Sequence, residues 1–372
     1  CSDSEMMLMM KNKEPRTTDL DINQKMVCNV VGSDVIFDAE GANVNILTIA
    51  KGANVTLEGL TYANANTTLN GAVLNKGNLT VVDSAFVNNT AASGGAIYST
   101  GALTVEGSVF VNNTATSSSY GGRAIYYSLV NGEFNVIDST FISNNAAGKG
   151  GAIYVYYGLP NIKDSEFYNN TATNNGGAIC FWRADGEIDN SYFENNTAVK
   201  SPGGAINLAV GGTVTNSQFV DNHAFMTNGA AISANGNNIY IANSTFAGIN
   251  LIAITGTATL ENNTELSAKV IDGYSVRVSS GKVTLIKNKF NSTIVIYAGG
   301  AILSEVNVTV LDNKTWDITE DTYALNATIV DDNGNLIYDK AVKFTVNGVE
   351  VPAIAYDDAT GLYTAVFTLT GE

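Results

Sequence analysis

Short stretches in which hydrophobic and polar residues alternate follow one another along most of the chain, separated by glycine, asparagine or aspartate. Leu103-Thr104-Val105 and Phe134-Asn135-Val136 are typical examples. Alternation with a period of two predicts β-strands that bury one face. No stretch sustains the period of 3.6 that an amphipathic α-helix requires. The pattern therefore predicts an all-β protein.

A short phrase, Ser-x-Phe, recurs seven times in the middle of the chain and sets the order of these strands. Successive copies lie 24, 31, 26, 26, 26 and 27 residues apart. A period of this size is typical of a solenoid in which each repeat forms one coil. The phenylalanines predicted to stack inside the coils are Phe86, Phe110, Phe141, Phe167, Phe193, Phe219 and Phe246.

A second phrase, Gly-Gly-Ala-Ile or a close variant, runs in phase with the first. Its copies begin at Gly94, Gly121, Gly150, Gly176, Gly203 and, in a weaker form, Gly229. Two punctuated segments in each repeat favour a parallel β-helix, with about three short strands per coil and equivalent residues about 4.8 Å apart. A β-propeller needs blades of about 40 residues or more, so it does not fit the observed period.

Comparison of the repeats with one another separates inward from outward positions. The residue between Ser and Phe varies from Ala85 to Glu166 and Tyr192, a mixture that no packed core accepts, so it is expected to face solvent. In the turn that follows, the first position of the Asn pair can be Asp221, and an unpaired buried aspartate would be costly. The second Asn is therefore predicted to be the inward one; its copies are Asn89, Asn113, Asn145, Asn170, Asn196 and Asn222.

The two phrases together resemble the repeats of bacterial polymorphic outer-membrane proteins. Their fuller wording, including Phe110-Val111-Asn112-Asn113-Thr114-Ala115, is similar to adhesin-like surface proteins of methanogenic archaea. The resemblance covers roughly residues 31 to 310. It implies a secreted, surface-displayed, right-handed parallel β-helix that acts in adhesion rather than catalysis.

The pattern divides the chain into three parts. Residues 1–30 are expected to form an amino-terminal cap or leader-proximal segment, and residues 31–305 the parallel β-helix with about 24–31 residues per coil. In residues 306–372 the period breaks and the strands lengthen between turn signals, which predicts a small immunoglobulin-like β-sandwich module. This module is short enough to lack its last strand.

Composition limits the classes of function. The net charge of −16 and the pI near 4.4 argue against nucleic acid, because phosphate binding needs clustered Lys and Arg. Three cysteines without tight spacing, Cys1, Cys28 and Cys180, support neither a disulfide framework nor a zinc site. No apolar run approaches the roughly 20 residues of a membrane-spanning helix. We expect an extracellular, monomeric solenoid at the cell surface that needs no cofactor.

Candidates for catalysis are few. Polysaccharide lyases and hydrolases also use β-helices, and Asp138 and Asp164 could form a carboxylate pair on neighbouring coils. Both precede Ser at a turn, so capping of the turn is the preferred interpretation. The single histidine, His223, is expected in a surface turn, and Asp331–Asn335 in a hairpin rather than a calcium loop. We therefore predict no catalytic residue and no metal ligand.

A row of aromatic residues is the most suggestive candidate for binding. If the isoleucines of the Gly-Gly-Ala-Ile phrases point inward, then Tyr98, Tyr126, Tyr154 and Cys180 point outward in one row. Tyr156 and Trp182 follow in the next row. An exposed ladder of rings suits recognition of a glycan or a protein. The alternative is that the rings stack on one another or lie beneath the 115–120 insertion.

Thirteen Asn-x-Ser/Thr sequons occur, and four of them use the outward Asn of the turn. The candidate glycosylation sites are Asn88, Asn112, Asn169 and Asn195. Since the repeat itself demands Asn-Asn-Thr, these sequons could equally be structural.

The features together favour a non-enzymatic cell-surface adhesin, or adhesin-like stalk, that binds cells, glycans or surface proteins of another cell. The alternatives are a β-helical carbohydrate-active enzyme, either a polysaccharide lyase or a hydrolase, and a passive component of the cell envelope.

Overall fold

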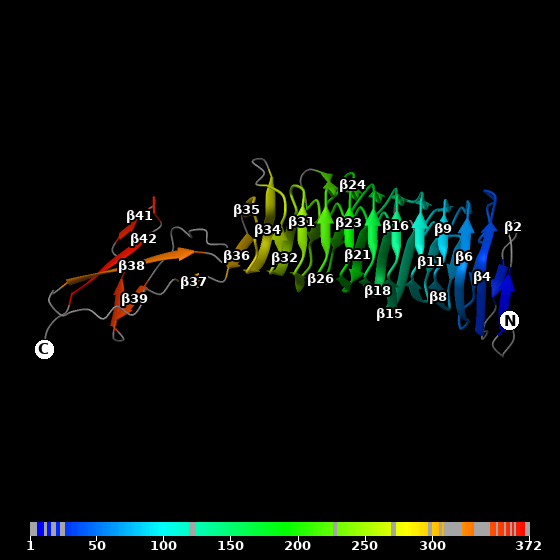
Figure 1. Ribbon diagram of the computed structural model, residues 1–372, viewed down its shortest axis with the longest axis horizontal. Coiled ribbons are helices and arrows are strands. Elements are labelled where there is room, and N and C mark those ends of the chain that lie inside the picture. The colour runs from blue at the N-terminus through cyan, green and yellow to red at the C-terminus, as the bar shows by residue number, and fades with distance from the viewer. Residues whose placement is uncertain are drawn as a thin grey trace.

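The computed structural model is a parallel β-solenoid whose coils stack along one axis (Figure 1). It describes residues 6–10, 13–15, 20–22, 27–118, 124–225, 229–268, 273–296, 300–304, 307–308, 322–330, 343–346, 349–352, 355–357, 359–360 and 362–368. The secondary-structure elements in these ranges, β1 to β42, are all β-strands. The predicted all-β parallel β-helix is confirmed, whereas its right hand stays a prediction.

Each coil passes through three faces, which we call the first, second and third face. The first face holds β3 (Leu20–Ile22), β5 (Leu47–Ile49), β7 (Val73–Asn75), β11 (Ile97–Ser99), β21 (Ile179–Ala184), β25 (Ile206–Leu208), β29 (Ile232–Ala234) and β35 (Thr293–Ile296). The second holds β1 (Met6–Met10), β8 (Asn78–Val82), β12 (Ala102–Glu106), β22 (Glu187–Asp189), β26 (Gly212–Thr215), β30 (Ile239–Ala242) and β36 (Gly300–Ser304).

The third face holds β2 (Lys13–Pro15), β9 (Ala85–Val87), β13 (Val109–Val111), β16 (Thr140–Ile142), β19 (Glu166–Tyr168), β23 (Tyr192–Glu194), β27 (Gln218–Val220), β31 (Thr245–Ala247) and β33 (Thr264–Glu265). Longer strands bend through two faces: β4 (Val27–Asp38), β6 (Asn54–Ala63), β15 (Ile125–Ile137), β18 (Ile153–Lys163), β32 (Ile252–Glu261) and β34 (Tyr274–Ile286). A small sheet beyond the third face holds β10 (Thr90–Ala91), β14 (Thr114–Ala115), β17 (Asn145–Ala146), β20 (Thr171–Ala172), β24 (Thr197–Ala198) and β28 (His223–Ala224).

A column of aromatic rings fills the core behind the third face. The phenylalanines of the Ser-x-Phe phrase pair in register from coil to coil, as Phe86 does with Phe110. The centroids of these two rings lie 4.8 Å apart and their planes differ by 2°. Phe37 and Tyr62 extend the column at its amino-terminal end, and Glu265 takes the equivalent position after Phe246. All seven repeat phenylalanines are buried.

Two ladders of polar side chains close the turns on either side of this column. Each turn Ser donates its hydroxyl to the carbonyl two residues earlier, as Ser84 does to Val82 at 2.7 Å. From Ser108 onward, each hydroxyl oxygen also accepts from the backbone N–H of the serine in the preceding coil, as Ser108 does from Ser84 at 3.1 Å. From Asn89 to Asn196, each inward Asn donates from Nδ2 to the Oδ1 of the next, as Asn89 does to Asn113 at 3.0 Å. The ladders therefore satisfy backbone and amide groups that the bend removes from the sheets.

One predicted member of the Asn ladder was wrong. In the third repeat the buried residue is Asn144, which donates to Asn170 Oδ1 at 3.0 Å, whereas Asn145 is exposed at the start of β17. The reason is that the ladder position lies three residues after the phenylalanine. In this repeat Ser143 takes the left-handed turn position, with a φ of 54°, that Asn112 takes in the coil before.

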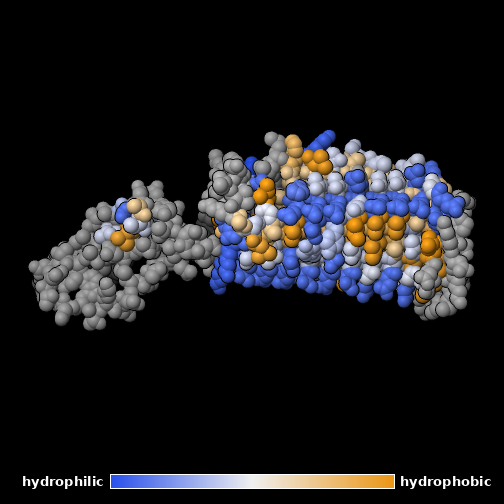
Figure 2. All heavy atoms as spheres, turned by 45° about the horizontal axis from the view of Figure 1, so that its top comes forward, coloured by the Kyte–Doolittle hydropathy of each residue, from blue (hydrophilic) through white to orange (hydrophobic). Residues whose placement is uncertain are grey.

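The turn residues at this left-handed position form an exposed row along the solenoid. They include Asn88, Asn112, Asn169, Asn195 and Asp221, with φ values between 46° and 57°. Figure 2 shows a hydrophilic band along the solenoid with hydrophobic surface beside it over the amino-terminal coils. On the outer side of the third face, the apolar side chains there are Ala85, Val87, Val109, Val111 and Ile142.

Parallel pairing extends beyond the predicted amino-terminal boundary. β1 pairs with β4, and β3 with β5, so residues before 31 already add strands to the solenoid. The role of residues 1–30 as a cap stays a prediction, and Cys1 lies outside the described residues.

At the other end the last parallel strand described is β36. The strands that follow pair antiparallel: β37 (Asn307–Val308), β38 (Thr322–Val330), β39 (Lys343–Val346), β40 (Val349–Pro352), β41 (Ala355–Asp357) and β42 (Leu362–Thr368). The immunoglobulin-like arrangement of this part stays a prediction, and the Asp331–Asn335 turn lies outside the described residues.

Candidate binding surface

The predicted aromatic row exists and lies on the outer side of the first face. Parallel pairing places Tyr98 beside Tyr126, Tyr126 beside Tyr154, and Tyr154 beside Cys180. The rings of Tyr98 and Tyr126 stack with their centroids 4.6 Å apart. We call these four residues the tyrosine row. Tyr156 and Trp182 pack against it from the next outward position.

The prediction that this row is exposed was wrong in its central part. Tyr126, Tyr154 and Cys180 are 5%, 2% and 0% exposed, while Tyr98, Tyr156 and Trp182 are half-buried. The Gly-Gly turns explain the burial. A Cβ atom on Gly176 would lie 3.0 Å from the Cβ of Cys180, so the turn backbone lies directly against the row. The mutual stacking considered as the alternative is therefore present.

Two cations complete the exposed end of this surface. The Nζ atom of Lys149 lies 3.5 Å from the centroid of the Trp182 ring. The guanidinium of Arg183 lies 5.5 Å from the ring of Tyr156 and donates from Nη1 to the hydroxyl of Tyr157 at 2.7 Å. Both distances fit cation–π contacts. We call these five residues, Lys149, Tyr156, Tyr157, Trp182 and Arg183, the aromatic–cation cluster.

Sequence reasoning missed Lys149, Tyr157 and Arg183. The signal that could have found them is position: Arg183 directly follows Trp182, and Lys149 directly precedes a Gly-Gly turn that folds against the row. The chain has only 19 basic residues against 35 acidic ones, so basic residues beside a predicted aromatic row point to a binding surface.

Burial controls the protonation of the tyrosine row. Removal from water raises the pKa of the Cys180 thiol to about 12, although the nearby charge of Lys149 acts in the opposite direction. Burial also raises the pKa of Tyr154 well above its ordinary value, with Cys180 and Tyr126 adding to the effect. Both groups are therefore neutral at physiological pH, and neither is an activated nucleophile.

The row continues to Asn207, which pairs with Cys180 on the neighbouring strand. Asn207 is fully buried, and neither its Oδ1 nor its Nδ2 has a hydrogen-bond partner among the described residues.

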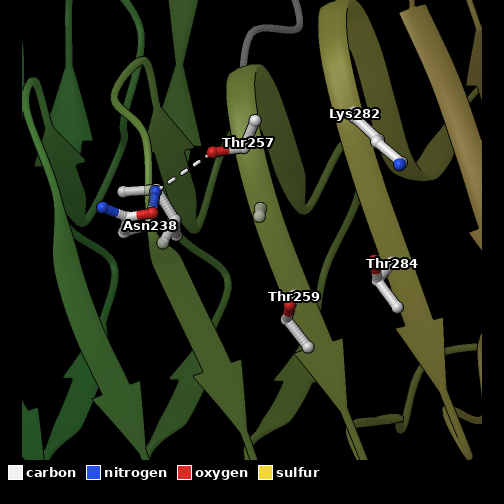
Figure 3. Close-up of a pocket in the computed structure, with 7 residues that line it drawn as sticks. Asn238, Thr257, Thr259, Lys282 and Thr284 are labelled. Atoms are coloured by element: carbon white, nitrogen blue, oxygen red, sulfur yellow. Dashed lines mark hydrogen bonds between the residues drawn. The ribbon is translucent and has the colours of Figure 1, made fainter.

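A shallow polar depression lies on the outer side of the second face, towards the carboxy-terminal coils (Figure 3). Its volume is about 270 Å³, and Thr257, Thr259, Thr284 and Lys282 contribute hydroxyls and an amine. The backbone N–H of Asn238 donates to Thr257 Oγ1 at 3.1 Å. The lining residues include no carboxylate, so the depression lacks a pair of acidic groups for general acid–base chemistry.

The other residues singled out by sequence lie in turns or on exposed strands. Asp138 and Asp164 take left-handed turn positions with φ values of 48° and 51°, and Asp164 Oδ1 accepts from the Asn190 amide. His223 is exposed in β28. In the described part of the chain, no three His, Cys, Asp or Glu side chains are grouped as metal ligands would be.

The four candidate glycosylation residues, Asn88, Asn112, Asn169 and Asn195, are all exposed on the outer side of the turn. Their modification stays a prediction. The described residues contain no helix that is both long enough and apolar enough to cross a bilayer.

The Ser-x-Phe phrase lies on the third face and the Gly-Gly phrase leads into the first face. Three coils of the chain that carry both phrases match the Chlamydia polymorphic membrane protein repeat. The matching segments are residues 83–100, 138–156 and 164–181, and each holds a Ser-x-Phe phrase together with the following Gly-Gly phrase. The chain thus carries a repeat of the polymorphic-membrane-protein type. No curated protein sequence matches the chain significantly.

Several solved structures show partial similarity to this chain at low sequence identity. A PL6 alginate lyase in complex with a trisaccharide is 11% identical, with a TM-score of 0.44 over 78% of this chain and 79% of that one. The catalytic domain of a GH87 α-1,3-glucanase is 12% identical, with a TM-score of 0.44 over 79% and 64%. The receptor-binding domain of the Siphovirus 9NA tailspike is 12% identical, with a TM-score of 0.31 over 90% and 84%. These similarities concern the fold alone.

Proposed function

We propose that this chain is a non-enzymatic, surface-displayed β-helical binding protein of the adhesin-like type, which holds a glycan or a surface protein of another cell. The observation that carries the proposal is the aromatic–cation cluster. It gathers three aromatic rings and two cations on one edge of the first face of an acidic solenoid. The polymorphic-membrane-protein-type repeat supports display at a cell surface.

The cluster suits retention of a ligand. Tyr156 and Trp182 are half-buried, so each ring is held by packing against the tyrosine row while part of it reaches solvent. Rings fixed on strands lose little freedom when a ligand binds, and Tyr and Trp combine apolar area with a polar group. Interface residues of this type often contribute most of the binding energy.

The finer parts of the proposal rest on the sequence. They are an extracellular location, a monomeric solenoid, glycosylation at the exposed turn asparagines and the likeness to adhesins of methanogenic archaea. The competing functions are a polysaccharide lyase or hydrolase and a passive envelope component.

The test is capture of the full chain on an array of glycans and immobilised surface proteins, followed by analysis of any released products. Replacement of Tyr156 and Trp182 together by Ala is expected to abolish capture. Tyr154 is left intact because it is buried and its loss would open a cavity.

A matched control is the pair Tyr168 and Tyr192, which also lie on neighbouring coils with ring centroids 5.6 Å apart, but on the third face. Their replacement by Ala should leave capture unchanged. Equal loss in both double variants would refute the assignment of the binding surface. Release of oligosaccharides would instead establish the enzyme, and no capture at all by the unaltered chain would favour the passive component.

A further inference from the structure

The aromatic–cation cluster holds two positive charges, those of Lys149 and Arg183. Among the described residues, Lys149 contacts the ring of Trp182 and Arg183 contacts Tyr156 and Tyr157, and neither cation forms an ion pair with a described carboxylate. Acidic residues outnumber basic ones by 35 to 19, so two cations grouped with aromatic rings stand out on this surface. An anion from outside the chain is the complementary partner.

Arg183 is held in a position that leaves most of its donors available. One N–H bond of the guanidinium is used on the Tyr157 hydroxyl, and its plane lies near the rings of Tyr156 and Tyr157, 5.5 and 5.7 Å from their centroids. A guanidinium carries five N–H donors in a rigid fork that matches the two oxygens of a carboxylate. The side chain is exposed, so these donors reach solvent.

The neighbouring rings add a flat apolar surface beside the charges. Tyr156 and Trp182 lie next to each other on β18 and β21, because Val155 pairs with Phe181 and Tyr157 pairs with Arg183 on either side of them. The C–H face of a sugar ring packs against such rings. Neighbouring coils are about 4.8 Å apart, close to the length of one pyranose unit, so successive sugars of a chain could meet successive strands.

We propose that the aromatic–cation cluster binds an acidic glycan, with a uronate carboxylate held by Arg183 and Lys149 and its sugar ring packed on Tyr156 or Trp182. The inference rests on the proposed binding function and adds the chemical class of the ligand. A neutral glycan would leave both cations without a partner. A nucleic acid is disfavoured because its continuous phosphate charge would be repelled by the net charge of −16. An acidic peptide could use the cations, but it would gain less from the two flat rings.

The experiment uses the fluorescence of Trp182 in the full chain. The sequence has two tryptophans, so Trp316→Phe leaves Trp182 as the single reporter. Hexagalacturonate, maltohexaose and hexaglutamate serve as the acidic-glycan, neutral-glycan and acidic-peptide probes. We expect hexagalacturonate to change the emission of Trp182 to saturation, with little effect of maltohexaose.

Substitution of each cation tests the contacts. Arg183→Gln and Lys149→Gln are each expected to weaken hexagalacturonate binding by about tenfold or more, the loss typical of one charge-assisted hydrogen bond. Lys163→Gln is the matched control, because it removes the same charge from β18 on the second face. The affinity of Lys163→Gln for hexagalacturonate should stay within about twofold of that of the parent, because surface substitutions away from a site usually have small effects. Thermal unfolding verifies that each variant is folded.

The acidic-glycan assignment is refuted if both Gln variants bind like the parent, or if maltohexaose binds as tightly as hexagalacturonate. Tighter binding of hexaglutamate would assign the site to an acidic peptide instead. If no probe binds Trp316→Phe but capture of the full chain still depends on Tyr156 and Trp182, the ligand class is wrong while the proposed binding function stands.

Discussion

At the scale of single residues, the repeat tolerates almost any side chain outside and very few inside. Glu166 and Phe167 are neighbours in β19, yet Glu166 is exposed and Phe167 is buried between Phe141 and Phe193, with ring centroids 4.9 and 4.8 Å away. In the turns, polar residues are accepted in the core because their side chains find hydrogen-bond partners in the neighbouring coils. The Asn ladder is an example, since Asn144 Nδ2 donates both to Phe110 O and to Asn170 Oδ1.

The register of this ladder can be tested within one dipeptide. Asn144→Ala removes an acceptor for Asn113 and a donor for Phe110 O, which are buried groups, so it should lower the free energy of unfolding by about 2–4 kcal/mol. Asn145→Ala changes an exposed side chain and should cost less than about 0.5 kcal/mol. Urea denaturation of both variants gives the comparison. A larger loss of stability for Asn145→Ala would instead place Asn145 in the ladder, as the sequence predicted.

At the scale of elements, the first face shows how a turn can bury a surface that strand alternation predicts to be open. The strands place Tyr126, Tyr154 and Cys180 outward, and the Gly-Gly turns then lie against them. The second glycine lets the turns of neighbouring coils stack closely, because a Cβ on Gly177 would overlap the carbonyl oxygen of Gly204. The same packing leaves Trp182 and Tyr156 at the edge, where a ligand can reach them.

The buried thiol and phenol of this face predict a loss of stability at high pH. Folding raises the pKa of Cys180 from 9.0 to about 12, and that of Tyr154 also rises. Below about pH 8.5 both the folded and the unfolded chain keep these protons, so the contribution to stability is complete. Above it the unfolded chain loses protons first, and stability falls as the pH rises towards 12.

Cys180→Ala should therefore flatten this fall by up to about 1.4 kcal/mol per pH unit between about pH 9.5 and 11.5. The measurement is urea denaturation as a function of pH, with Cys1 and Cys28 replaced by Ser in both proteins. In the same background, the native Cys180 thiol should resist iodoacetamide at pH 8 and react after unfolding. Identical pH profiles for the two proteins, or rapid native alkylation, would contradict burial of the thiol.

At the scale of the whole molecule, each coil contacts mainly its neighbours, so stability is distributed along the axis rather than concentrated in one centre. The aromatic column ends at Glu265, which is 4% exposed. Its carboxylate accepts from Ser275 Oγ, from the N–H of Asn291 at 2.7 Å, and from the hydroxyl of Ser292 at 2.8 Å. This carboxylate joins the last complete coils.

Replacement of Glu265 by Ala should loosen the carboxy-terminal coils alone. The change leaves several buried donors without an acceptor, so we expect local opening to become easier by about 3 kcal/mol or more. Hydrogen exchange should accelerate in residues 274–296 while β11 to β23 stay protected. Glu261→Ala is the control, because its carboxylate accepts from the Tyr240 hydroxyl on the outer surface. Uniformly faster exchange along the solenoid would refute the nearest-neighbour account.

The sequence alone determined the class of fold, the period and the side of each strand that faces inward. It did so because a solenoid repeats one local solution, and comparison of Phe86, Phe110 and Phe167 with the variable residues before them separates core from surface within a single chain. The sequence comparison assigned the ladder position to Asn145 instead of Asn144. The reason is that Ser143 stands where the other repeats have Asn or Asp at the left-handed turn position, so the Asn pair is shifted by one residue.

Only the tertiary structure decided which outward residues are accessible. Burial of the tyrosine row depends on turn backbone that folds back against it, and contact of Lys149 with Trp182 joins residues 33 positions apart. Strand alternation describes which way a side chain leaves its own strand. It carries no information on what the neighbouring turn then places over that side chain, and this decides where a ligand can bind.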